Sequence, residues 1–400
     1  MGELIPDPEL ERIIQEMNRE EAAEHAEADE GAVWDGPDLR EVHGDEALDA
    51  ILSEMVRRQA SDLLLVPDSK PVVRIDGRLE TLPLAEVTDE AIRGHFTPHL
   101  SRRARRALAE RGSADFSLHL AGSSERESWR LRVNLQRQGG RLAAAIRALP
   151  RRIPSLEELT LPFALGDLAT NTNGLVLVCG PTGSGKSTTL AAILDQLNQT
   201  DFRHIITIED PVEYEHCNRR SVFEQVEVGS DVPEFAMALR AALRRDPDVI
   251  LVGEMRDLET ISTALTAAET GHLVLSTLHT ADSAQAIHRI IDVFPGSQQE
   301  QIRHQLALSL RAIVSQQLIP TAMGRGRVPA VELLLANIAV RNHIRRGNIE
   351  RLYNEITAGR SQGMQTMEQA LTDLVRGGAI AAEEALSRSS RPDELNRMLA

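Results

Sequence analysis

The chain has 400 residues, enough for two or three domains, and its 42% hydrophobic and 26% charged residues are ordinary for a globular protein. No stretch approaches the roughly 18 apolar residues of a membrane-spanning helix, and the first residues lack the basic start and apolar core of an export signal. The two cysteines, Cys179 and Cys217, are far apart, which excludes a tetracysteine zinc site and disfavours a disulfide framework. We therefore expect a cytoplasmic protein.

The net charge of −16 is concentrated at the N-terminus. Residues 1–50 carry 17 acidic side chains and 3 arginines, a net −14, so the remaining residues are close to neutral. Such a segment tends to be solvated and repels nucleic acid. Residues 1–45 are predicted to form a disordered acidic tail with one weak helix near 8–30, and a docking tail for a partner is the alternative.

Residues 46–148 have the pattern of a small α+β domain. Apolar residues between 45 and 58 recur at helical spacing, and Asp76-Gly77 between two short apolar runs indicates a hairpin. Pro150 and Pro154 mark 149–158 as a linker. Helices are predicted at 45–58 and 101–111, and strands at 63–66, 72–75, 79–82, 115–120, 129–136 and 142–148.

From residue 159 the pattern changes to alternating strands and helices, as a mostly parallel α/β sheet requires. This second domain is predicted to span 159–335, and a mainly helical region is predicted at 336–400. Asp257 is the expected N-cap and Gly271 the expected C-cap of one of its helices. Strands are predicted at 174–179, 204–208, 249–252, 272–277 and 331–335, and helices at 233–244 and 258–270.

The run from 180 to 188 fits the phosphate-loop pattern GxxxxGK[ST], with an apolar strand before it and a helical pattern after it. Glycines let backbone N–H groups surround phosphates, and the helix N-terminus adds its positive dipole end. Lys186 can neutralise the β and γ phosphates, and Ser187 can bind Mg²⁺. The predicted nucleotide-binding residues are Gly180, Pro181, Thr182, Gly183, Ser184, Gly185, Lys186, Ser187 and Thr188.

Carboxylates follow two other predicted strands. The strand at 249–252 leads to Glu254, which we interpret as the base that orients the attacking water, because the usual strand-end aspartate is absent. The strand at 204–208 leads to Glu209 and Asp210, which suit a catalytic site with magnesium-bound water. Glu209 is predicted to be catalytic, and Asp210 is predicted to join Ser187 at Mg²⁺.

Two histidines flank a further apolar strand. His272 and His279 are seven residues apart, which places them on opposite faces of a continuous strand and disfavours one shared metal. With the phosphate loop at the same sheet edge, one of the two is the predicted sensor of the γ-phosphate, and His279 is predicted to be catalytic.

These four motifs, in this order, resemble those of the secretion and pilus motor ATPases, and more specifically the type IV pilus retraction ATPases of twitching motility, the PilT family. The similarity covers about 46–385. The matching stretches are 60–63, 74–77, 209–213, 239–244, 246–249, 253–257, 267–272, 340–345 and 363–367.

The resemblance implies a PAS-like N-terminal domain joined to a RecA-like P-loop ATPase domain, with nucleotide between them. It also implies catalytic arginines from the N-terminal domain, at the positions of Arg132 and Arg147. A homo-hexamer is implied, using ATP and Mg²⁺. It would lie peripherally at the inner-membrane pilus base, with a platform protein and a paralogous retraction ATPase as partners.

Several alternatives remain open. Leu64 stands where the family often has His, and His343-Ile344 where it usually has Leu-Ile, so retraction is less secure than ATP hydrolysis. A pilus assembly or type II secretion motor is the nearest alternative, although the missing tetracysteine insertion disfavours it. With only 3% aromatic residues the chain is a poor nucleic-acid translocase, and its complete motif set disfavours a non-catalytic regulator.

Overall fold

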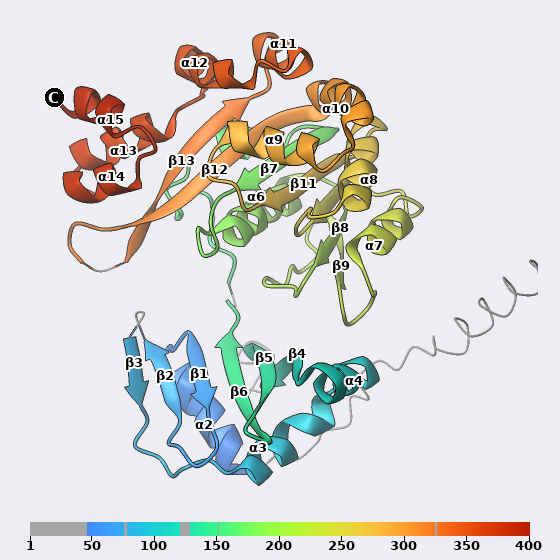
Figure 1. Ribbon diagram of the computed structural model, residues 1–400, viewed down its shortest axis with the longest axis vertical. Coiled ribbons are helices and arrows are strands. Elements are labelled where there is room, and N and C mark those ends of the chain that lie inside the picture. Colours follow the sequence, from blue (N-terminus) through green and yellow to red (C-terminus); the bar gives the residue numbers. More distant parts are fainter. Residues whose placement is uncertain (1–45, 76–77, 121–128, 151, 325) are drawn as a thin grey trace, which may run out of the picture.

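The computed structural model describes residues 46–75, 78–120, 129–150, 152–324 and 326–400. The predicted acidic tail, the Asp76-Gly77 turn and Arg151 of the predicted linker lie outside the described residues. Two β-sheets, one in each part of the chain, organise the molecule (Figure 1). None of the described helices is both long enough and apolar enough to cross a lipid bilayer.

The first sheet has six strands in the order β3-β2-β1-β6-β5-β4, and every neighbouring pair is antiparallel. Alternation along β5 buries Leu131, Val133 and Leu135 against the helices and leaves Arg130 and Arg132 on the opposite face. Its elements are α2 (Glu46–Arg57), β1 (Asp62–Leu65), β2 (Val72–Ile75), β3 (Arg78–Thr81), α3 (Asp89–Phe96), α4 (Arg102–Arg111), β4 (Ser113–Leu120), β5 (Trp129–Gln138) and β6 (Arg141–Ala148).

The sequence patterns predicted most of these elements to within about two residues. They did not indicate α3, which Thr88 caps by accepting a hydrogen bond from the Ala91 N–H. Only Ile92, His95 and Phe96 of this helix are buried. These three residues span little more than one turn, which is too short for an apolar periodicity to indicate a helix.

The second sheet has seven strands in the order β13-β12-β7-β11-β10-β8-β9, and only β13 runs antiparallel to its neighbour. Strands β7, β10 and β11 are buried along their whole length, which explains their unbroken apolar runs. Its strands are β7 (Gly174–Cys179), β8 (His204–Glu209), β9 (Val222–Glu227), β10 (Val249–Val252), β11 (Leu273–Leu278), β12 (Leu310–Pro320) and β13 (Arg327–Leu335).

Helices cover both faces of this sheet (Figure 1). Asp257 caps α8 as predicted, by accepting from the Thr260 N–H, but the C-cap is Thr270 and Gly271 follows it with φ of +116°. Helices α5, α9 and α10 and strands β9 and β12 had not been predicted. The helices are α5 (Ala164–Leu168), α6 (Lys186–Thr200), α7 (Phe235–Ala242), α8 (Leu258–Glu269), α9 (Ser283–Asp292) and α10 (Gly296–Ser309).

The C-terminal region is helical, as predicted. Helix α13 packs on β13 and on α15, so this helical region is attached to the second sheet through its edge strand (Figure 1). Its α-helices are α11 (Ile338–Arg346), α12 (Leu352–Ala358), α13 (Met367–Arg376), α14 (Ala382–Arg388) and α15 (Pro392–Leu399).

Candidate active site

The phosphate loop connects β7 to α6 at the carboxyl edge of the seven-stranded sheet. Gly180 and Gly185 have φ of +144° and +91°, a region that other residues rarely adopt. A Cβ on Gly180 would lie 2.3 Å from the backbone oxygen of Gln316 in β12. Glycine is therefore required at position 180 both by the conformation of the loop and by the neighbouring strand.

Lys186 begins α6 and is only 9% exposed. Its Nζ donates hydrogen bonds to the backbone oxygens of Gly180 at 2.9 Å and Pro181 at 3.1 Å. Burial lowers the pKa of Lys186, an effect that Glu213 and Glu254 oppose. Both acceptors are neutral carbonyls, so a charged phosphate oxygen would be a stronger partner for this ammonium.

Gln316 supports the loop from β12, a role that was not predicted from the sequence. Its Nε2 donates to the Ser184 backbone oxygen and its Oε1 accepts from the Thr189 hydroxyl, each at 2.8 Å. The side chain is 3% exposed, so both bonds are made away from water. Polar residues 315–317 within an otherwise apolar strand were the available signal, because a buried amide in a strand needs dedicated partners.

We expect Gln316→Glu to weaken ATP binding. A carboxylate of the same shape cannot donate to the Ser184 backbone oxygen and adds a negative charge beneath the loop. Leaving one buried group unsatisfied costs about 1–3 kcal/mol, or roughly five- to 150-fold in affinity. Equilibrium binding of a fluorescent ADP analogue measures this. Gln317→Glu on the opposite face of β12 is the matched control, and equal losses from both variants would contradict the support role.

Glu254 follows β10 and is held near the phosphate loop by its neighbours. Thr277 at the end of β11 donates its hydroxyl to the Gly253 backbone oxygen at 2.5 Å, which ties the two strand ends together. The Glu254 carboxylate lies 2.8 Å from Arg256 Nη2 and 3.7 Å from His279 Nε2. Burial, followed by the charge of Lys186, lowers the pKa of His279, so its neutral form is favoured beside Glu254.

The two predicted histidines lie at opposite ends of β11. His279 follows the carboxyl end, next to Glu254, whereas His272 precedes the strand and its Nδ1 lies 3.0 Å from the Ala267 backbone oxygen. The β-strand between them separates the two side chains, so only His279 is placed for catalysis.

Glu209 ends β8 and lines a small pocket together with Ser187, Gly253 and Thr277. Burial raises the pKa of Glu209 to about 7, and the hydrogen bond from Gln225 to its Oε1, at 3.5 Å, opposes the rise. The segment after Glu209 also contacts the phosphate-loop helix, because the Tyr214 and Thr188 hydroxyl oxygens are 2.9 Å apart. Glu209 is therefore brought next to the loop, as its position in the sequence predicted.

Asp210 lines a different cavity from the one that Glu209 lines. It lines a wide cavity of about 810 Å³ between the two sheets, whereas Glu209 lines the pocket of Ser187. Consecutive residues at a strand end point in opposite directions, so only one of the two carboxylates faces Ser187. In this structure the carboxylate that shares a pocket with Ser187 is thus Glu209, and the role of Asp210 at Mg²⁺ stays a prediction.

The two predicted arginines pair within the six-stranded sheet. Arg132 lies 3.7 Å from Asp115 and lines the wide cavity, and Arg147 donates to Asp62 at 2.8 Å. Neither forms a hydrogen bond or ion pair with the described residues of the phosphate loop. Arg130, on the same strand as Arg132, does bond across to the second domain: it donates to the Val212 backbone oxygen at 2.5 Å and pairs with Glu227.

Residues 44–376 match the protein family described as "Type II/IV secretion system protein". A "Twitching motility protein" of Neisseria gonorrhoeae is 44% identical over 326 residues, covering 82% of this chain and 86% of that protein. The "Type IV pilus retractation ATPase PilT" of Pseudomonas aeruginosa is 42% identical over 343 residues, covering 86% and 98%.

Among solved structures, one described as "Crystal Structure of the Pilus Retraction Motor PilT and Bound ADP" superposes with a TM-score of 0.80. It shares 46% identity and covers 88% of this chain and 99% of its own. This similarity confirms the predicted α/β class, with an N-terminal domain, a P-loop ATPase domain and C-terminal helices. The chain therefore belongs to the type II/IV secretion system protein family and, within it, is an ATPase of the PilT type.

Proposed function

We propose that this ATPase works as a hexameric, magnesium-dependent motor that powers type IV pilus retraction and twitching motility. The observation that carries the proposal is the identity with retraction ATPases, which extends over both sheets rather than the phosphate loop alone. The meeting of Lys186, Glu254 and His279 at one sheet edge supports it.

In the proposed reaction, a water oxygen bonds to the γ-phosphorus while the bond from that phosphorus to the β–γ bridging oxygen breaks, which releases ADP and phosphate. Glu254 orients the water and accepts its proton, and His279 contacts the γ-phosphate from beside Glu254. Lys186 bears part of the charge that develops on the phosphate oxygens. Glu209 orders the solvent next to Ser187 in the pocket they share.

Arg132 and Arg147 are proposed to complete the site when the N-terminal part of the chain closes over nucleotide. In the present arrangement Arg132 is 40% exposed and pairs with Asp115, and Arg147 is 64% exposed and pairs with Asp62. Exposed ion pairs contribute little free energy, so either arginine can leave its carboxylate and bind a phosphate at little cost. Hydrolysis would then depend on closure, which is how chemistry couples to movement.

The residues near Ser187 fit a hard divalent cation. Its hydroxyl and the Glu209 carboxylate are oxygen donors that line one pocket, and Mg²⁺ prefers oxygen ligands and takes most of them from phosphate and water. Bound Mg²⁺ would neutralise charge on the β and γ phosphates. Ser187 is the proposed direct ligand, whereas Asp210 would have to act from the wide cavity.

For the motor as a whole, we propose two moving units, residues 46–148 and 159–335, joined by a linker at 149–158, with 336–400 attached to the second. Six copies would form a cytoplasmic ring at the inner-membrane pilus base, bound to the platform protein there and working with a paralogous retraction ATPase. These assignments rest on the similarity to retraction ATPases.

Gene deletion tests the direction of this motor. We expect a deletion strain to carry more surface pili than the parent and to lose twitching motility, because assembly continues without retraction. Electron microscopy of pili and a motility assay measure both, and expression of the intact gene should reverse them. Loss of surface pili would instead assign the motor to pilus assembly, and normal pili with defective protein export would assign it to type II secretion.

A further inference from the structure

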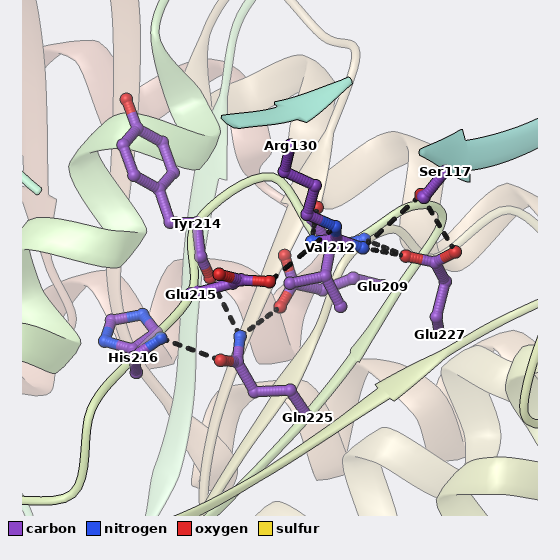
Figure 2. Close-up of polar contacts among 9 residues, drawn as sticks. All are labelled: Ser117, Arg130, Glu209, Val212, Tyr214, Glu215, His216, Gln225 and Glu227. Atoms are coloured by element: carbon purple, nitrogen blue, oxygen red, sulfur yellow. Dashed lines mark hydrogen bonds and ion pairs between the residues drawn. The ribbon is translucent and has the colours of Figure 1, made fainter. Parts of the chain in front are cut away.

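Arg130 connects the two sheets. It lies on β5 of the six-stranded sheet, yet its side chain is only 13% exposed, because it reaches the segment that follows β8 (Figure 2). Its Nη1 donates to the Val212 backbone oxygen at 2.5 Å, and its Nε lies 3.8 Å from the Glu215 carboxylate. Its Nη2 forms an ion pair with Glu227, the last residue of β9.

Glu227 also binds the backbone of Val212, at its N–H group. Its Oε2 accepts the Val212 N–H at 3.1 Å, and its Oε1 accepts the Ser117 hydroxyl of β4 at 3.4 Å. Arg130 and Glu227 together therefore bind both the N–H and the C=O of Val212. Since Glu227 is 14% exposed, the Arg130–Glu227 pair lies largely away from solvent, where its geometry matters more than at the surface.

The held segment carries Glu209. Gln225, two residues before Glu227 on the same side of β9, donates to the Tyr214 backbone oxygen at 2.9 Å and accepts from the His216 N–H at 2.8 Å. The same amide lies 3.5 Å from Glu209 Oε1 (Figure 2). Residues 209–216 are thus fixed at Val212 by Arg130 and Glu227, and at both flanks by Gln225.

We propose that Arg130 is a positioning residue, which holds the Glu209-bearing segment 209–216 in its active geometry and makes that geometry depend on where the six-stranded sheet lies. A displacement of the sheet by an ångström or more would break the bond to Val212, because hydrogen bonds weaken steeply beyond about 3.2 Å. This rests on the proposed role of Glu209 in hydrolysis.

Arg132, two residues after Arg130 on β5, differs from Arg130 in how its guanidinium group is bonded. Arg132 lies on the same face, but among the described residues it pairs with Asp115 alone, at 3.7 Å, and it is 40% exposed. Arg130 uses all three of its guanidinium nitrogens on partners already present. Arg130 therefore acts through the protein backbone, whereas Arg132 is free to meet the nucleotide.

The test is steady-state hydrolysis by the purified full chain. Arg130→Ala should lower kcat roughly tenfold to a hundredfold, the cost of a misplaced catalytic segment, with ADP affinity within about threefold of normal. Arg130→Lys keeps the charge but lacks the planar fork that reaches Val212, Glu215 and Glu227 from three nitrogens, so an intermediate loss is expected. Arg137→Ala, an exposed residue of the same strand, is the matched control and should retain normal kcat.

A double-mutant cycle separates this role from direct contact with phosphate. If Arg130 and Glu227 hold the segment only by acting together, the kcat of the double variant Arg130→Ala with Glu227→Ala should be no lower than that of the slower single variant. Losses that multiply, or a fall in ADP affinity as large as the fall in kcat, would overturn the proposal. If Arg130→Ala does not yield folded protein, the cycle is run with Arg130→Lys. Pilus counts do not enter this test, so its failure is distinct from failure of the retraction proposal.

Discussion

Glu254→Gln is expected to stop ATP turnover while leaving nucleotide binding intact. The amide has the shape of the carboxylate and can still reach Arg256 and His279, but it cannot accept a proton from water. Losing a general base lowers a rate by roughly 100- to 10,000-fold. Phosphate release under saturating ATP and magnesium measures kcat, and equilibrium binding of a fluorescent ADP analogue measures affinity.

The control for Glu254 is a carboxylate outside the site. Glu383→Gln changes an exposed residue of α14 and should keep normal turnover. If Glu254→Gln hydrolyses ATP at the normal rate, Glu254 is not the base. If it binds ADP much more weakly, the residue contributes to binding rather than to the chemical step.

Lys186→Ala is expected to weaken nucleotide binding itself. The side chain supplies a buried positive charge next to the phosphate-loop carbonyls, in a place where electrostatic attraction is weakly screened. Loss of this charge should weaken ADP and ATP affinity by roughly 100-fold or more. Lys186→Arg should not restore binding, because a planar guanidinium does not fit where a compact ammonium is enclosed.

The chain provides its own control for this variant. It contains only two lysines, and the second, Lys70, is exposed between β1 and β2. Lys70→Ala should bind nucleotide normally, as measured by the same fluorescence titration. Normal affinity in Lys186→Ala would contradict the phosphate-loop assignment.

The sequence was enough to predict elements whose structure depends on residues close to one another in the chain. The loop at 180–188 combines glycines with a following lysine, and these few consecutive residues are enough to indicate a phosphate-binding loop. The buried strands β7 and β10 have apolar runs whose lengths match the observed strands. Because parallel strands present their carboxyl ends at one edge, Glu209, Glu254 and His279 could also be assigned to one site.

Other features required contacts between distant segments. Strand β12 was not predicted, and with it Gln316 was missed, although that residue bonds to Ser184 and Thr189 from 132 and 127 positions away. Which of the two carboxylates, Glu209 or Asp210, shares a pocket with Ser187 depends on the direction of each side chain at the end of β8. No periodicity along the chain contains that information.

The sequence by itself determined the phosphate loop, the order of the catalytic motifs and the two-part α/β organisation, because each depends on residue type at short spacing. Only the tertiary structure decided that Arg130, rather than Arg132 or Arg147, bonds to the Val212 segment. All three arginines lie on polar positions of neighbouring strands and look alike in sequence. Their roles separate only when the two sheets meet, since an arginine's function is set by the partners within reach of its guanidinium group.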